Sequence, residues 1–167
     1  MNPAGLPGLD PKAGLLIDTN LLVLLAVGSV NRNRIENFKR TRQYTKSDYD
    51  LLVRIVGKRA LYTVAHVMAE VSNLTDLKGG ERLRARQVLA ETLVILQEPH
   101  VPSILAAGNS LYESLGLTDS AITQVAREHL CTVLTDDWDL YHSLSREKLP
   151  VYNFTHLRQY SWDNRDY

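Results

Sequence analysis

Cysteine is nearly absent from this 167-residue sequence, in which Cys131 is the only one. A single cysteine cannot form an intramolecular disulfide, and because Cys131 lies within an apolar run, we interpret it as a buried thiol. Free thiols persist in reducing compartments, so the sequence predicts a cytoplasmic protein.

A long hydrophobic run is also missing. The apolar stretch near the N-terminus, residues 15–27, is interrupted by Asp18 and Asn20, and it falls short of the ~20 apolar residues that span a bilayer. We therefore expect neither a secretion signal nor a membrane anchor here.

Neither sign of charge is in excess. Lys and Arg together number 19, as do Asp and Glu, so the formal net charge is zero and any binding to a polyanion must use a local basic patch. No Gly-rich phosphate loop of the P-loop type occurs. The five histidines lack metal-ligand spacing, and we interpret His129, on an apolar stripe, as a core residue.

Apolar runs alternate with amphipathic stretches after an irregular leader over residues 1–13, which contains Pro and Gly. No hairpin turn signal joins the runs, which favours a parallel sheet with helices on both faces. We predict one α/β domain, a three-layer sandwich around four to five short parallel strands. Strands are expected near residues 14–18, 61–64, 131–134 and 151–154. Helices are expected near residues 20–28, 65–75, 81–97, 103–115 and 137–147, with another opening at residue 118.

The segment from residue 31 to 59 is a basic and helical arm within this domain. Six of its first sixteen residues are Lys or Arg, against the single acid Glu36. The arm is either a solvated surface segment or a phosphate-contacting element. Asp48 is a candidate cap for its helix. The candidate RNA contacts are Arg32, Arg34, Lys39, Arg40 and Arg42.

Acidic residues recur where the predicted parallel strands end or the following helices begin. Asp18 and the pair Asp136 and Asp137 follow strands, Asp119 opens a helix, and Glu70 lies inside the helix after the second strand. Taken singly, each Asp is a good helix N-cap. Gathered at one sheet edge, the carboxylates would raise one another's pKa values unless divalent cations neutralised them, and oxygen ligands suit Mg²⁺ or Mn²⁺.

These blocks together resemble a known family. The stretches Ile17-Asp18-Thr19-Asn20, Val67-Met68-Ala69-Glu70-Val71, Leu117-Thr118-Asp119-Ser120-Ala121 and Thr135-Asp136-Asp137-Trp138-Asp139 are similar in order and spacing to the PIN domain, especially to VapC-type toxins. The resemblance covers residues 14–156.

The resemblance implies a PIN-like fold and an acidic quartet of Asp18, Glu70, Asp119 and Asp137 that binds one or two Mg²⁺ or Mn²⁺ ions. It makes Asn20 and Thr135 supporting groups and Asp139 an outer metal partner. Either Asp136 or Asp137 is the inner ligand, and the family's Thr-x-Asp spacing favours Asp137.

The activity that the resemblance implies is metal-dependent endoribonucleolytic cleavage of RNA, with a toxin–antitoxin pair as one biological setting. It also implies a homodimer and a small antitoxin-like inhibitor. The arm over 31–59 makes the region between Asp18 and Glu70 longer than in minimal members of the family. This extra segment would be a specificity element or a partner surface. The tail over 157–167 is polar and aromatic, and its structure is left unassigned.

Two other functions compete with this one. A haloacid-dehalogenase-type phosphatase needs a second aspartate two residues after the first, where this chain has Asn20. A catalytically silent PIN-fold module that binds proteins is the other alternative. All four acids are present, which disfavours it, because an inactive site gains nothing from clustered buried charge.

Overall fold

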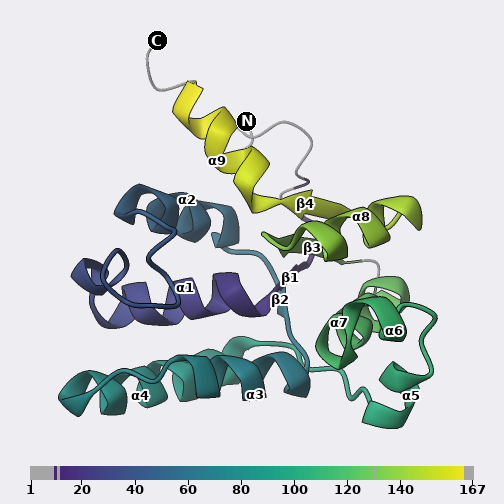
Figure 1. Cartoon of the computed structure of the whole chain (residues 1–167), viewed down its shortest axis with the longest axis horizontal. Coiled ribbons are helices and arrows are strands. Elements are labelled where there is room, and N and C mark those ends of the chain that lie inside the picture. The colour runs from purple at the N-terminus through teal and green to yellow at the C-terminus, as the bar shows by residue number, and fades with distance from the viewer. Residues whose placement is uncertain (1–9, 11, 130, 164–167) are drawn as a thin grey trace.

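A four-stranded, entirely parallel sheet forms the centre of the molecule in the computed structural model, which describes residue 10, residues 12–129 and residues 131–163 (Figure 1). The strand order is β2-β1-β3-β4. The leader predicted over 1–13 lies mostly outside the described residues. The strands are β1 (Leu15–Ile17), β2 (Leu61–Tyr62), β3 (Thr132–Thr135) and β4 (Val151–Asn153).

The central strands are apolar on both faces because helices cover both. Leu15, Leu16 and Ile17 in β1, and Val133 and Leu134 in β3, are all at most 1% exposed. This is the pattern of buried parallel strands rather than of half-exposed hairpins. Ile17 pairs with Leu134, so β1 and β3 end side by side at the same edge of the sheet.

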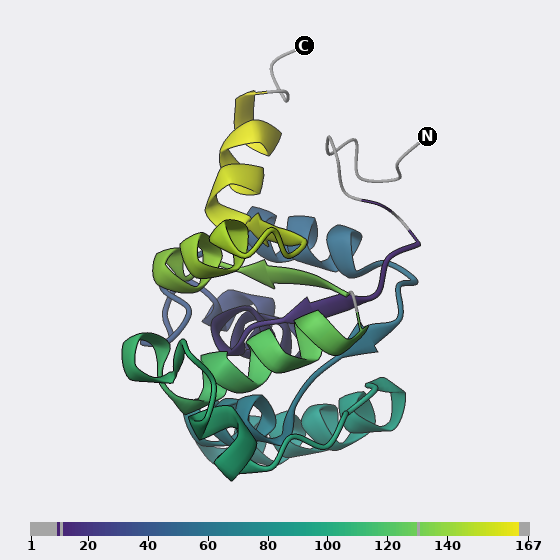
Figure 2. The same cartoon turned by 90° about the vertical axis from the view of Figure 1, so that its right-hand side faces the viewer.

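Helices make up the outer layers. Figure 2 shows α7 in front of the strands, with α1 and α2 behind them. The pair α3 and α4 packs against α1. The helices before the third strand are α1 (Thr19–Val30), the 3-10 turn η1 (Arg32–Arg34), α2 (Lys46–Val56), α3 (Ala65–Leu74), α4 (Gly79–Ile95), α5 (Ser103–Ala107), α6 (Tyr112–Leu115) and α7 (Leu117–His129). Those after it are α8 (Trp138–Arg146) and α9 (Phe154–Asp163).

The predicted three-layer α/β sandwich around a parallel sheet is therefore confirmed, with four strands among the described residues. No helix in the described part of the chain has both the length and the apolar character needed to cross a membrane.

The single helix predicted over 103–115 is wrong. The chain forms α5 and α6 instead, because Asn109 stands between them and its side-chain oxygen accepts a hydrogen bond from the backbone N–H of Leu111 (3.0 Å). Such a local turn competes with the helical hydrogen bonds.

The cap predicted for the arm's helix is also wrong in position. Thr45 caps α2, and Asp48 occupies the third helical position, where its carboxylate accepts from the backbone N–H of Thr45 (2.7 Å). The two residues thus form a reciprocal capping box. The buried Asp48 carboxylate, 1% exposed, also pairs with Arg158 of α9 at 2.8 Å. This ion pair ties the helix that the sequence left unassigned to the arm.

Two predictions of burial fail on the helices. The sequence of the helix near 81–97 also predicts that Leu83 and Leu93 face inward. In the structure α4 buries only Ala85 and Leu89, and Leu83 and Leu93 are 64% and 43% exposed. The helix lies at the margin of the domain against α1, so a narrow apolar stripe is enough to hold it. His129 is exposed at the end of α7, against the ring of Tyr62, and is not a core residue.

Candidate active site

A cavity of about 450 Å³ opens where β1 and β3 end, and its lining includes Asp18, Asn20, Glu70, Asp119 and Asp137. Four separate parts of the chain bring in the acids: the β1–α1 junction, α3, α7 and the β3–α8 junction. No Lys, Arg or His among the described residues lines this cavity. The structure therefore gathers the predicted acidic quartet around one space, and the described part of the chain brings no basic side chain to it.

Asp18 is fixed by hydrogen bonds to both of its carboxylate oxygens. Oδ1 accepts from the backbone N–H of Leu21 (3.0 Å) and so caps α1, while Oδ2 accepts from the hydroxyl of Thr135 and from the backbone N–H of Asp136 (3.0 Å). The side chain is only 4% exposed. Burial first, and then the negative charge of Asp136, raise the pKa of Asp18 to about 8.

Asp119 lies in the first turn of α7, just after Gly116, whose positive φ of 82° lets the chain turn out of α6. Burial, followed by the charges of Asp137 and Glu70, raises the pKa of Asp119 to about 7. The charges that raise this pKa belong to other cavity acids, so electrostatic repulsion within the cavity connects three of them.

Glu70 is positioned by two threonines that the sequence did not single out. Its Oε1 accepts from the hydroxyl of Thr118 (2.5 Å), and its Oε2 accepts from the hydroxyl of Thr19 (3.1 Å). Both threonines also line the cavity. Each is the immediate sequence neighbour of a predicted acid, Asp119 or Asp18, and that adjacency is the signal that could have identified them.

The neighbouring acids Asp136 and Asp137 take different positions. Asp137 lines the cavity and its Oδ1 caps α8 by accepting from the backbone N–H of Leu140 (2.9 Å). Asp136 is absent from the lining and accepts instead from the amide of Asn20 (3.2 Å) and from the hydroxyl of Tyr44. The geometry therefore favours Asp137 as the inner acid.

Tyr44 belongs to the arm and is, like the two threonines, a site residue that the sequence did not indicate. Its side chain is buried, 1% exposed, and burial together with the charge of Asp136 raises the pKa of Tyr44 strongly. The hydroxyl therefore stays protonated and donates to Asp136. Nothing in the local sequence around Tyr44 indicates this contact, which joins the arm to the acidic site.

The remaining predicted residues, Thr135 and Asp139, flank Asp136 and Asp137 in the sequence. Thr135 is fully buried; besides donating to Asp18, its hydroxyl accepts from the backbone N–H of Asp137 (2.9 Å), so one side chain orders two of the acids. Asp139 lines a neighbouring cavity rather than the acidic one.

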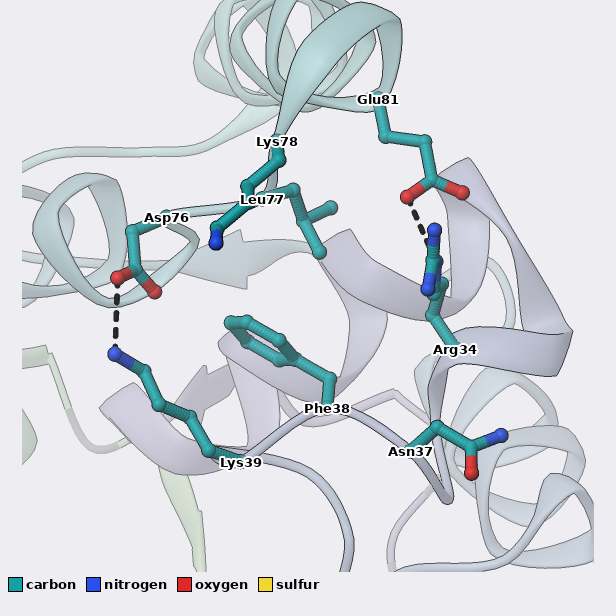
Figure 3. A pocket seen from close by; sticks show the side chains of 8 residues that line it. All are labelled: Arg34, Asn37, Phe38, Lys39, Asp76, Leu77, Lys78 and Glu81. Carbon is teal, nitrogen blue, oxygen red and sulfur yellow. Dashed lines mark hydrogen bonds and ion pairs between the residues drawn. The ribbon is translucent and has the colours of Figure 1, made fainter.

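Three of the predicted RNA-contacting cations are held in ion pairs. Arg32 pairs with Asp50 (2.6 Å). In Figure 3, Arg34 pairs with Glu81 and Lys39 with Asp76, on opposite sides of a cavity of about 370 Å³ in which the ring of Phe38 lies. The pairs of Arg34 and Lys39 dock the arm onto α4 and onto the loop before it, whereas the pair of Arg32 lies within the arm.

Arg40 and Arg42 differ from the other three cations. Both are exposed, and neither side chain has an ion pair or hydrogen bond within the described part of the chain. They lie between the ion-paired Lys39 and Tyr44, which contacts Asp136. The arm therefore presents two exposed guanidinium groups that have no ion pair, although the hydrogen bond from Lys39 and, to a lesser extent, the charge of Arg40 lower the pKa of the nearby Asp76.

The donor set of the cavity fits a divalent cation. All the candidate ligands are oxygens, which Mg²⁺ and Mn²⁺ prefer, and two of the carboxylates have pKa values raised to about 7 and about 8 in the absence of a neighbouring positive charge. Within the described residues, no three His, Cys, Asp or Glu side chains already form a metal-holding group. Asp18, Glu70, Asp119 and Asp137 are the residues that would hold the ion.

Comparison with known proteins gives no family for this chain. No protein-family model matches it, and no curated protein matches it.

Proposed function

We propose that this protein is a Mg²⁺- or Mn²⁺-dependent endoribonuclease of the PIN type that hydrolyses RNA phosphodiester bonds at the acidic cavity. The observation that carries the proposal is the convergence of Asp18, Glu70, Asp119 and Asp137 from four parts of the chain on one cavity that no basic side chain of the described residues lines. Clustered carboxylates destabilise a fold unless a bound cation offsets their repulsion. The motif resemblance to the PIN domain points to the same chemistry.

One or two divalent ions bound there would supply a Lewis acid, lower the pKa of a water molecule and offset the charge of the phosphate. The protein's own part is to keep the ligands in place. Asp18 is fixed by α1 and Thr135, and Glu70 is fixed by the two threonine hydroxyls. Such preorganisation lowers the reorganisation needed when substrate binds.

Charged groups of the arm suggest the substrate class. The cavity itself is acidic and repels a polyanion until a cation is bound, while Arg40 and Arg42 lie exposed on the arm, whose Tyr44 contacts the acid Asp136. We propose that these two guanidinium groups contact RNA phosphates, as Arg does in bidentate geometry. Arg32, Arg34 and Lys39 would contribute less, because each is already paired with an acid.

The cellular setting is part of the same proposal. Cys131 is a buried free thiol, and burial raises its pKa to about 11, so it has little tendency to react. We propose a cytoplasmic enzyme on that basis. A homodimer and a small antitoxin-like inhibitor follow from the resemblance to VapC-type toxins.

The test is cleavage of a mixed pool of single-stranded and hairpin RNAs by the full chain with Mg²⁺, with Mn²⁺ or with chelator. Asp119→Asn is the active-site variant, and Glu98→Gln, an exposed acid outside the helices and strands, is its matched control. We expect cutting only with metal, a loss of at least a hundredfold in Asp119→Asn, and full activity in Glu98→Gln. Equal cutting by both variants would reject the assignment of the site.

A second candidate function, a catalytically silent protein-binding module, is favoured by a separate observation. Several large apolar side chains of α4 and α5 are exposed, among them Val94 (85%), Ile95 (68%) and Ile104 (79%). Such surfaces often mark protein interfaces. A chain that cuts no RNA under any metal, and whose melting temperature ignores Mg²⁺ and Mn²⁺, would support this alternative over the nuclease.

A further inference from the structure

A second cavity, of about 540 Å³, adjoins the acidic one. Leu115 lines both cavities. Asp137 lines the acidic cavity and the next residue, Trp138, lines the second, and consecutive Cα atoms lie about 3.8 Å apart. The two cavities therefore meet at Leu115 and at the junction of Asp137 with Trp138.

The side chain of Trp138 is more exposed than is usual for so large an aromatic residue. The side chain is 54% exposed, while α8 buries Leu140 and Leu144 in the core instead. The indole is nevertheless braced by other rings: His142 lies edge-to-face with it at a centroid distance of 4.3 Å, and His156 does so at 5.7 Å. A large aromatic surface that is held in place but left open suits stacking by a flat ligand.

The rest of the lining supplies polar groups for such a ligand. Asp139 and Ser143 offer acceptor and donor atoms on the same helix, one on each side of His142 in the sequence. Arg146 also lines the cavity, and its side chain forms no ion pair or hydrogen bond with the described residues. The volume lies within the range of about 300–1,000 Å³ typical of small-ligand pockets.

We infer that this second cavity receives the unpaired RNA base next to the scissile phosphate, and that Trp138 is the residue on which the base stacks. The inference rests on the proposed function, since it takes the ligand to be RNA. A phosphate held at the acids is joined to its nearest base through one sugar, and the lining of the second cavity begins at Trp138, the residue after Asp137. Sequence-specific RNA recognition targets unstacked bases, which stack on aromatic side chains.

The role is specific to single-stranded RNA. A base inside a duplex has both faces occupied by its neighbours and cannot reach Trp138 without being flipped out. Trp138 would thus act as a specificity residue that selects an unpaired nucleotide at the cleavage position, while the acids act on the phosphate alone.

Tryptophan fluorescence tests this inference without relying on turnover. The chain has two tryptophans, Trp138 and Trp162, so Trp162→Phe leaves Trp138 as the only strong emitter. This variant is titrated with a mixed-sequence single-stranded RNA 12-mer in Ca²⁺, which also takes oxygen ligands, and the RNA is checked for cutting at the end. We expect quenching of Trp138 by the single strand and little by the matching duplex.

Two substitutions of Trp138, each in the otherwise unchanged full chain, distinguish the effect of aromatic stacking from the effect of side-chain size. We expect Trp138→Leu to weaken binding of the single strand about tenfold, as loss of one stacked base does, and Trp138→Phe to retain most of the affinity. Equal affinity of the leucine variant and the wild type, equal losses in both variants, or no binding by the wild type would each overturn the inference.

The outcomes also separate this inference from the proposed function. A chain that binds the single strand through Trp138 but never cuts it would leave the base site standing and reject the nuclease. If the wild type cuts RNA with metal, and Trp138→Leu keeps the same affinity and the same cleavage positions, the nuclease function is supported and the base site is rejected.

Discussion

Replacing Asp119 with Asn should stabilise the metal-free protein at pH 8 and have little effect at pH 4.5. The pKa of Asp119 is raised from 3.8 to about 7 by burial and by the charges of Asp137 and Glu70. A raised pKa means that the folded state holds the proton more tightly than the unfolded state does. The stability that this provides is present at low pH and is lost as the pH rises through about 7.

The magnitude follows from the same rise in pKa. At about 1.4 kcal/mol per pKa unit, the rise corresponds to ~4 kcal/mol once Asp119 is ionised, and partial exposure to solvent reduces this to on the order of 2 kcal/mol. Asn removes the charge but keeps the shape. The acid's favourable place in the first turn of α7 offsets ~0.5 kcal/mol of the gain.

The assay is urea unfolding in chelator at both pH values, with Glu98→Gln as the control. We expect Asp119→Asn to be more stable than the wild type by on the order of 2 kcal/mol at pH 8 and by less than ~0.5 kcal/mol at pH 4.5. We expect the control to show no such dependence on pH. A variant that is less stable than the wild type at pH 8, or a difference equal at both pH values, would mean that the ionised Asp119 carboxylate does not destabilise the folded state.

Three further predictions concern residues around the site. Tyr44→Phe removes the hydroxyl that donates to Asp136 and should cost about 1–3 kcal/mol in the free energy of urea unfolding; an unchanged value would mean that this hydrogen bond does not contribute. Arg158→Ala leaves the buried carboxylate of Asp48 without its cation and should cost about 3 kcal/mol in the same assay, and a cost below ~1 kcal/mol would contradict the ion pair's role. Arg42→Ala should weaken RNA binding and reduce the salt slope of the affinity by about 1, as one lost phosphate contact does; a slope equal to that of the wild type would place Arg42 outside the interface.

The core of the fold could be predicted from sequence because local patterns determine it. Leu15, Leu16 and Ile17 form an apolar run too short for a helix, and Asp18 ends the run, so both the strand and the cap of the next helix were readable. The sequence also predicted that the acids lie close together, because parallel strands end at one edge of a sheet.

The rest depends on contacts between distant parts of the chain. The hydrogen bond from Tyr44 to Asp136 joins positions 92 residues apart, and no periodicity encodes it. Leu83 and Leu93 have the spacing of a buried stripe, but α4 packs at the margin of the domain and leaves them exposed. The break at Asn109 is a local preference that competes with a helical pattern, and here the side-chain hydrogen bond prevails.

The most direct test of the account is the binding of Mn²⁺ to the chelator-treated protein, measured by electron paramagnetic resonance as the loss of the free-ion signal. We predict that the wild type binds one or two ions per chain, that Asp119→Asn and Glu70→Gln bind none at the same concentrations, and that Asp139→Asn, whose carboxylate lines the neighbouring cavity, keeps at least one. Binding by the wild type that is no stronger than binding by Asp119→Asn would contradict the claim that the four acids form a cation site.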